Sequence, residues 1–210
     1  MLALVTGGLT RLGAAIAARL AAAGYDLALH ARRAGEPEAM LAAAIAERGV
    51  AWHAFDADLG EAAAVDALVG RVAERFGRTP DLLVNSASTF GQGGWNGLTR
   101  DQLDRHMAVN FTAPVLLTGA LARGGGRAVV NILDQRIVNP PLDQAAYTAS
   151  KLALGSLTRV LARAFAPRMR VNAVAPGLTI PGDDYGASQV MRLADAMPLR
   201  RLPRPEQVAD

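Results

Sequence analysis

Short apolar runs alternate with longer helical segments along most of this 210-residue chain, and this alternation limits its fold more than any other feature. The longer segments repeat apolar residues at intervals of three and four, which is the period of a helix. A strand, a helix and the next strand form a unit whose strands run parallel, with helices covering the sheet. The predicted strands are Leu2–Thr6, Asp26–His30, Val50–Phe55, Asp81–Asn85, Arg127–Leu133 and Arg170–Val174. The predicted helices are Leu12–Ala23, Glu36–Arg48, Glu61–Phe76, Thr99–Ala122 and Ala145–Ala166.

This order of elements predicts an α/β fold, a Rossmann-like doubly wound parallel sheet with helices on both faces. Because 51% of the residues are hydrophobic and 20% are charged, we expect one domain, residues 1–210, around one buried core. The alternation breaks after Gly177, and an amphipathic segment follows over 187–197. We expect residues 178–200 to form a mobile substrate lid. The last residues, Pro205–Asp210, are typical of the start of a helix, so we also expect the chain to be truncated.

The composition argues against several classes of protein. With no cysteine and only three scattered histidines, disulfides and thiolate zinc sites are excluded, and we predict no metal site. The basic residues are spread singly, so the net charge of +3 indicates an arginine-rich surface and no nucleic-acid groove. No stretch of eighteen apolar residues and no charged leader are present in the sequence, so we expect a soluble, cytoplasmic protein without a membrane span.

Lys151 is the single lysine beside 21 arginines, and it follows Tyr147 by four residues. That spacing puts both side chains on one face of a predicted helix. A nearby ammonium lowers the pKa of a phenol from its usual value near 10, and a compact ammonium can also bind a cofactor ribose. The pair therefore predicts acid catalysis beside a cofactor. The alternative is a surface pair at helical spacing.

A glycine-rich turn, Thr6–Gly13, joins the first predicted strand to the first helix. Glycines let the backbone approach a pyrophosphate, and the helix N-terminus offers it free N–H groups and partial positive charge. Gly7, Leu12 and Gly13 are the predicted contacts. A tight turn without a ligand is the alternative.

The residues after the second and later strands predict the kind of nucleotide. His30, Arg32 and Arg33 follow the second strand, where an enzyme that uses NAD has an acidic residue. Guanidinium groups suit a 2′-phosphate, so we predict NADPH, with an exposed basic turn as the alternative. Asp58 and Leu59, after the third strand, could meet the adenine, although Asp58 could also be a residue near a helix cap. Asn85 and Ala87, at the end of the fourth strand and just after it, are two further candidates at the ligand-binding edge of the sheet.

Three residues near the pair suggest a substrate site. Asp134 follows the fifth strand and could polarise or protonate a substrate, or could only complete a turn. Asn110, within a predicted helix, could anchor a water that leads to Lys151, or could repair a kink. Phe90 stands in a polar loop, where it could stack on a planar ligand or simply anchor the loop.

Taken in order, these motifs resemble those of the short-chain dehydrogenase/reductases over the whole chain. The matching segments are Thr6–Gly13, Asn85–Ala87, Asn110, Tyr147-x-x-x-Lys151 and Pro176–Gly177. The resemblance implies that Tyr147 is the proton donor, that Lys151 modifies its pKa and binds the ribose, and that Asn110 belongs to a proton relay. It implies cofactor contacts from Pro176, Gly177 and Thr179, the last with the nicotinamide carboxamide. It also implies a homo-oligomer, a tetramer.

Two departures are similar to the pteridine reductase subgroup: Arg11 stands in place of a glycine and Asp134 in place of a serine. The resemblance implies that Arg11 lies near the cofactor phosphate and the substrate, that Asp134 assists Tyr147, and that Ser88 and Phe90 contact the substrate. We therefore expect an NADPH-dependent reductase of a dihydropterin or dihydrofolate.

Two alternatives remain: a carbonyl or 3-oxoacyl reductase of the same family, and a non-catalytic NADP-binding regulator or scaffold. Ser86 replaces an asparagine common in the family, and the family's final strand is missing from the sequence.

Overall fold

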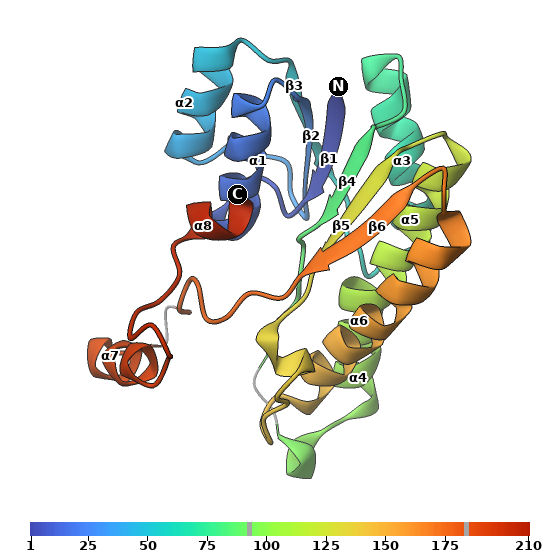
Figure 1. Cartoon of the computed structure of the whole chain (residues 1–210). Helices are drawn as coiled ribbons and strands as arrows, with labels where there is room; N and C mark the ends of the chain where they lie inside the picture. The colour runs from blue at the N-terminus through green and yellow to red at the C-terminus, as the bar shows by residue number, and fades with distance from the viewer. Residues whose placement is uncertain (92–93, 183–184) are drawn as a thin grey trace.

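All strands of the sheet run parallel, in the order β3-β2-β1-β4-β5-β6 (Figure 1). The structure is a computed structural model that describes residues 1–91, 94–182 and 185–210. The strands are β1 Leu2–Thr6, β2 Asp26–Ala31, β3 Trp52–Asp56, β4 Leu82–Asn85, β5 Ala128–Ile132 and β6 Arg170–Val174. The order reverses between β1 and β4, as in a doubly wound sheet, so the predicted fold class is confirmed.

Helices cover both faces of the sheet (Figure 1). They are α1 Arg11–Ala22, α2 Ala39–Arg48, α3 Ala62–Phe76, α4 Arg100–Met107, α5 Ala113–Arg123, α6 Ala145–Phe165, α7 Ala187–Asp195 and α8 Pro205–Ala209. One core cluster joins α1 and α2 to one face of the sheet, and the other joins α3 and α5 to the opposite face. The central strands β1, β2 and β4 are thus largely buried on both sides, which explains their mostly apolar sequences.

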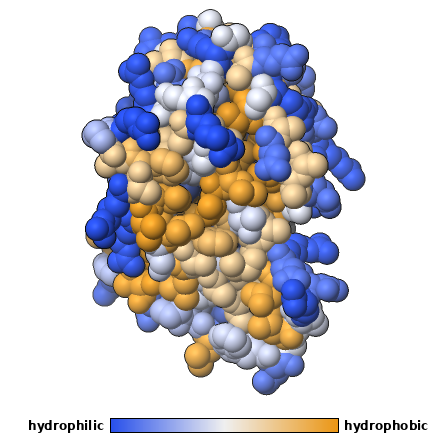
Figure 2. Space-filling model, turned by 90° about the vertical axis from the view of Figure 1, so that its right-hand side faces the viewer, coloured by the Kyte–Doolittle hydropathy of each residue, from blue (hydrophilic) through white to orange (hydrophobic). Residues whose placement is uncertain are grey.

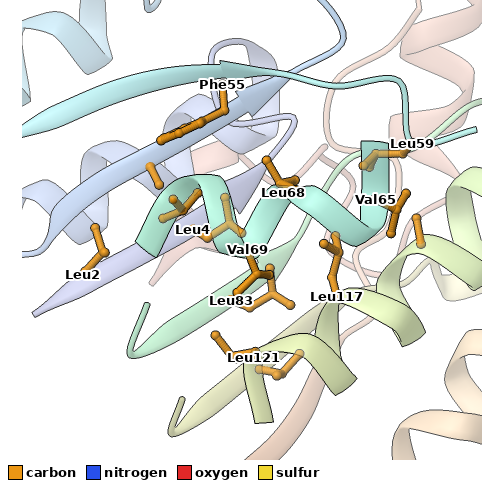
Figure 3. Packing of buried hydrophobic residues seen from close by; sticks show 14 of the residues in the cluster. Leu2, Leu4, Phe55, Leu59, Val65, Leu68, Val69, Leu83, Leu117 and Leu121 are labelled. Atoms are coloured by element: carbon orange, nitrogen blue, oxygen red, sulfur yellow. The ribbon is translucent and has the colours of Figure 1, made fainter. Parts of the chain in front are cut away.

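Strand β1 shows how the sequence divides between the two layers. All five of its residues are buried, and successive side chains point to opposite faces. Leu2 and Leu4 join the cluster with α3 and α5, while Ala3 and Val5 join the cluster with α1 and α2. Figure 3 shows the cluster with α3 and α5, in which Leu68 and Val69 of α3 and Leu117 and Leu121 of α5 pack together.

Two predicted helices differ from those observed. The helix predicted over 99–122 consists of α4 and α5 joined by a π-helical turn, Ala108–Thr112, which contains the buried Asn110. Helix α2 begins at Ala39 rather than Glu36, because Glu38 lies against the glycine-rich turn, where its N–H donates to the Leu9 carbonyl. The remaining predicted elements match within about two residues at each end.

The C-terminal segment returns to the first helix. Helix α8 packs on α1, and Arg19 forms an ion pair with Asp210 at 2.8 Å (Figure 1). Helix α7 projects from the rest of the molecule and buries none of its residues. Strand β6 is the edge of the sheet in the described part of the chain. Within that part, the helices are too short or too polar to cross a membrane.

Candidate active site

The predicted catalytic pair lies at the carboxyl edge of the sheet, at the start of α6. Tyr147 and Lys151 are both buried. Asp134 follows β5, and its carboxylate Oδ2 accepts a hydrogen bond from the Tyr147 hydroxyl at 2.9 Å. Residues thirteen positions apart in sequence therefore form one acid–base pair.

The environment of Tyr147 changes one expectation from the sequence. Burial of the phenol and the charge of Asp134 raise the pKa of Tyr147 well above its usual value. We expected Lys151 to lower that pKa, but its Nζ lies 5.8 Å from the centre of the Tyr147 ring and donates to the Ile132 carbonyl at 2.8 Å. Burial lowers the pKa of Lys151 to about 8. In this arrangement Tyr147 holds its proton and directs it at Asp134.

Asn110 holds the loop after β4 in place. Its Oδ1 accepts from the Thr89 N–H at 2.8 Å and from the Ser88 hydroxyl at 3.1 Å. Its Nδ2 donates to the Thr89 carbonyl at 3.0 Å and to the Ser150 hydroxyl at 3.1 Å. The π-helical turn is what aims this amide into the protein, since one extra residue in the turn rotates the side chain relative to a regular helix. Asn110 thus joins the loop after β4 to α6 beside Lys151.

Phe90 lies where a planar ligand could stack. Its ring is 52% exposed and meets the Tyr147 ring edge-on, with 4.8 Å between centres. Arg136 places its guanidinium carbon 5.9 Å from the centre of the Phe90 ring. Arg136 also pairs with Asp143 at 2.7 Å and lies 4.0 Å from Asp134. These contacts gather an exposed aromatic face, a carboxylate and a buried phenol.

The glycine-rich turn forms a cradle that fits a nucleotide pyrophosphate. Gly7 has φ +64°, and a Cβ at Gly13 would lie 1.9 Å from the Gly7 carbonyl oxygen. In the described structure, Thr10 gives the first turn of α1 no side-chain cap, and the Arg11 N–H donates to the Glu38 carboxylate at 2.8 Å. The next N–H groups of that turn can receive an anion. Leu12 and Gly13 are the residues whose N–H groups stand there.

His30 supports this cradle from beneath rather than facing a ligand. It is 2% exposed, its Nδ1 lies 3.2 Å from the Gly7 N–H, and its Nε2 lies 3.0 Å from the Ala57 carbonyl. A ring with the proton on Nε2 satisfies both contacts, and burial lowers the pKa of His30, which favours this neutral form. The predicted cofactor contact of His30 is therefore replaced by a supporting role.

The other predicted nucleotide contacts divide into two groups. Arg32 and Arg33 are exposed, and no hydrogen bond or ion pair holds either guanidinium within the described structure. Asp58 is exposed and accepts the Gly60 N–H at 2.8 Å, and Leu59 is buried in the core, so its side chain cannot reach a ligand. Asn85 is likewise buried.

Asn85 and Ala87 take different places at the end of β4. The Asn85 amide donates to the Asn131 side chain at 2.8 Å, because its side chain points into the layer between the sheet and the helices rather than toward the ligand edge. Ala87 instead touches the cradle, since a Cβ on Gly7 would lie 3.0 Å from its Cα.

Arg11 connects the cradle to the segment after β6. It has φ +56°, and its N–H donates to Glu38 Oε1 at 2.8 Å. Its guanidinium donates to the carbonyls of Ile180 and Pro181 at 3.2 and 3.4 Å. Arg11 therefore does not touch Phe90 or Asp134 in this structure.

The segment that begins at Pro176 lies beside the substrate site. The Pro176 carbonyl accepts the Gln135 N–H at 2.9 Å, and the Thr179 hydroxyl donates to the Gly177 carbonyl at 3.0 Å. This places the segment next to the turn that follows Asp134. Of the lid predicted over 178–200, residues 183–184 lie outside the described residues.

Several residues at the site were missed from the sequence. The Thr6 hydroxyl accepts the N–H groups of Ser86 and Ala87, each at 3.0 Å, and so fixes the β4 loop against the cradle. Glu38 binds Arg11, which is distant in sequence, and Arg136 binds Asp143 on a neighbouring turn. No local sequence motif indicates either contact. Among the described residues, no group of three or more histidine or acidic side chains could hold a metal ion.

Known proteins resemble this chain over most of its length. The family described as short chain dehydrogenase matches residues 1–182. The chain is 32% identical to pteridine reductase 1 from Leishmania tarentolae, over 99% of this chain and 87% of that protein. It is 33% identical to D-threitol dehydrogenase from Mycolicibacterium smegmatis, over 99% and 82%.

Solved structures show the same likeness. The crystal structure of FolM alternative dihydrofolate reductase 1 from Brucella canis, complexed with NADP, matches with a TM-score of 0.89 and 36% identity. The match covers 99% of this chain and 84% of that chain.

Proposed function

The chain belongs to the short chain dehydrogenase family, and we propose that it is an NADPH-dependent reductase of a pterin or a dihydrofolate. The observation that carries this proposal is the Asp134–Tyr147 pair beside the half-exposed ring of Phe90. A flat heterocycle stacked on Phe90 would present a ring nitrogen to the Tyr147 hydroxyl. The related pteridine reductase and the alternative dihydrofolate reductase support the same substrate class.

We infer NADP(H) as the cofactor from the nucleotide end of the site. Gly7, Leu12 and Gly13 would hold the pyrophosphate, and Arg32 and Arg33 would bind the 2′-phosphate with paired charged hydrogen bonds. The neighbouring structure that was solved with NADP supports this assignment. When bound, the cofactor supplies a hydride to a carbon of a substrate C=N bond.

The chain itself handles the proton. Tyr147 donates its proton to the ring nitrogen, for which its hydroxyl hydrogen turns from Asp134 Oδ2 to the substrate. The buried Lys151 ammonium offsets the negative charge of the phenolate that forms. It would also bind the cofactor ribose, with Nζ either giving up its hydrogen bond to the Ile132 carbonyl or donating to both groups. Asn110 keeps the loop of Ser88 and Phe90 against α6 during the reaction.

The assay is NADPH oxidation with dihydropterins and dihydrofolate, set against a panel of ketones and 3-oxoacyl thioesters. We expect turnover of the dihydropterins by the unmodified protein. In Phe90→Ala the turnover should fall by at least about 100-fold, because the stacking surface is gone. Met40→Ala, an exposed apolar residue on α2, is the matched control. Turnover of ketones alone would exclude the pterin substrate and leave the family intact.

We also infer that the protein is a homo-oligomer. Apolar side chains are exposed on the outer faces of two neighbouring helices, with Leu116 on α5 at 41% and Leu152 and Val160 on α6 at 39% and 57%. Figure 2 shows an apolar region on the side of the molecule where α6 lies in Figure 1. Burying such a patch against a second copy is favourable by roughly 25 cal/mol per Å².

We propose in addition that residues 178–200 close over the bound substrate.

A further inference from the structure

A small cavity of about 10 Å³ adjoins Tyr147, and its size matches one water molecule or one amino group. Its walls include Gly91 of the loop after β4, His106 of α4, and Gln144 and Tyr147 at the start of α6. The cavity therefore shares Tyr147 with the proposed substrate site. None of the steps above uses it.

His106 presents a hydrogen-bond acceptor to this cavity. The residue is 7% exposed, and its Nδ1 lies 2.8 Å from the Gln102 carbonyl oxygen. Because a carbonyl can only accept, Nδ1 carries the proton, and Nε2 of the neutral ring is left with a lone pair. Nε2 is buried and has no partner among the described residues.

Gln144 presents a second acceptor. Its Oε1 is also buried without a hydrogen-bond partner in the described part of the chain. The Gln144 backbone is left-handed, with φ 52° and ψ 50°, an unfavourable conformation for a residue with a side chain. With the Gln144 amide in this orientation, both atoms that border the cavity are acceptors and cannot satisfy each other, and a group that carries two hydrogens would pair both.

We propose that His106 and Gln144 form a subsite for an exocyclic amino group of the substrate heterocycle. An amino group on an aromatic ring offers two N–H donors, one for His106 Nε2 and one for Gln144 Oε1. A ring oxo group in the same place would leave both acceptors unpaired. This subsite rests on the proposed function, which places the heterocycle against Phe90 and Tyr147, and it selects substrates by a group distant from the reacting bond.

The first test compares pterin with lumazine, which carry an amino and an oxo group at carbon 2. Their dissociation constants are measured by pteridine fluorescence on the protein saturated with NADP+. We expect pterin to bind at least about 10-fold more tightly, because a missing donor at a built polar site is strongly rejected. Gln144→Leu should reduce the ratio to about 3-fold or less, while Gln144→Glu, which keeps an acceptor, should preserve it.

His106→Phe should also abolish the preference, and His53→Phe is its matched control. His53 lies in β3 against Phe55, at the opposite end of the sheet order from the substrate site. The control variant should keep the ratio of the unmodified protein. Equal binding of pterin and lumazine to the unmodified protein would mean that the cavity holds only a water, and the proposal would be wrong.

A second readout does not depend on turnover or on pteridine binding. The chain has three histidines, so the ring nitrogens of 15N-labelled protein can be assigned with the two single variants. We expect His106 Nε2 to be unprotonated, and its signal to move on addition of 2-aminopyrimidine but not of 2-pyrimidinone. A signal that does not move overturns the subsite. Movement of the signal without any reduction of dihydropterins would retain the subsite and refute the proposed reaction.

Discussion

At the scale of single residues, the proton donor is controlled by its neighbours. Burial and Asp134 raise the pKa of Tyr147, so in Asp134→Asn the loss of the negative charge should lower that pKa. The same substitution replaces the carboxylate that orients the hydroxyl with a neutral amide, which is a weaker acceptor, and kcat should fall by about 100-fold. Titration of tyrosine absorbance in the unmodified protein and in this variant measures the shift, and Tyr147→Phe identifies the signal among three tyrosines. An unchanged titration would contradict the pairing.

Lys151 should set the alkaline limit of activity. Its pKa is lowered to about 8 by burial, so the free enzyme loses the ammonium as the pH rises through that value. If the ammonium is needed, log kcat/KM should decline above about pH 8. Lys151→Arg keeps its charge in this range and should remove the decline, although its rate will be lower because a guanidinium has another shape. Persistence of the decline in this variant would assign it to another group.

At the scale of elements, the contact between the cradle and α1 depends on a missing side chain. A Cβ at Gly13 would lie 1.9 Å from the Gly7 carbonyl oxygen, so Gly13→Ala must push the helix from the turn. We expect a loss of about 1–3 kcal/mol in the free energy of unfolding and a large loss of NADPH affinity.

Gly70→Ala is the control, because nothing lies within 4 Å of a Cβ there and its position is exposed on α3. It should gain roughly 0.5–1 kcal/mol and bind NADPH normally. Urea unfolding and quenching of protein fluorescence by NADPH measure the two effects. Normal NADPH binding by Gly13→Ala would contradict the role of the cradle.

Most elements follow from sequence because strand and helix periods are local properties. The strands were predicted in order, and Tyr147, Lys151 and Asp134 were brought together as expected. The π-helical turn at Asn110 was not predicted, since one extra residue in a turn leaves the apolar pattern of a helix almost unchanged. His30 was predicted to contact the cofactor, whereas it supports the glycine-rich turn. A histidine at the end of the second strand could have either role, and the sequence does not distinguish them.

At the scale of the whole molecule, the contacts that sequence does not show are those between distant segments. Arg136, His106 and Glu38 gain their roles only when the sheet brings separate loops to one edge. Parallel strands have their carboxyl ends on one side, so the edge could be predicted but the pairing across it could not.

The exposed apolar face of α5 and α6 gives a prediction for the assembled protein. Val160→Glu should convert the proposed oligomer to smaller species, because a carboxylate would lose its water on association. Sedimentation velocity measures the change, and Met40→Glu, an exposed apolar position on α2, should leave the sedimentation unaltered. Identical sedimentation of the Val160→Glu variant and the unmodified protein would place the interface elsewhere.

Arg11 joins three parts of the chain, since it bonds to Glu38 and to the carbonyls of Ile180 and Pro181. A phosphate in the cradle would draw this guanidinium away from those neutral acceptors, because a charged partner forms the stronger hydrogen bond. Arrival of the nucleotide would thereby free the segment beside the substrate site. The steady-state kinetics should then follow a compulsory order, with NADPH first and NADP+ last to leave. Product inhibition by NADP+ should be competitive against NADPH and noncompetitive against the substrate, and Arg11→Ala should relax this order toward random addition.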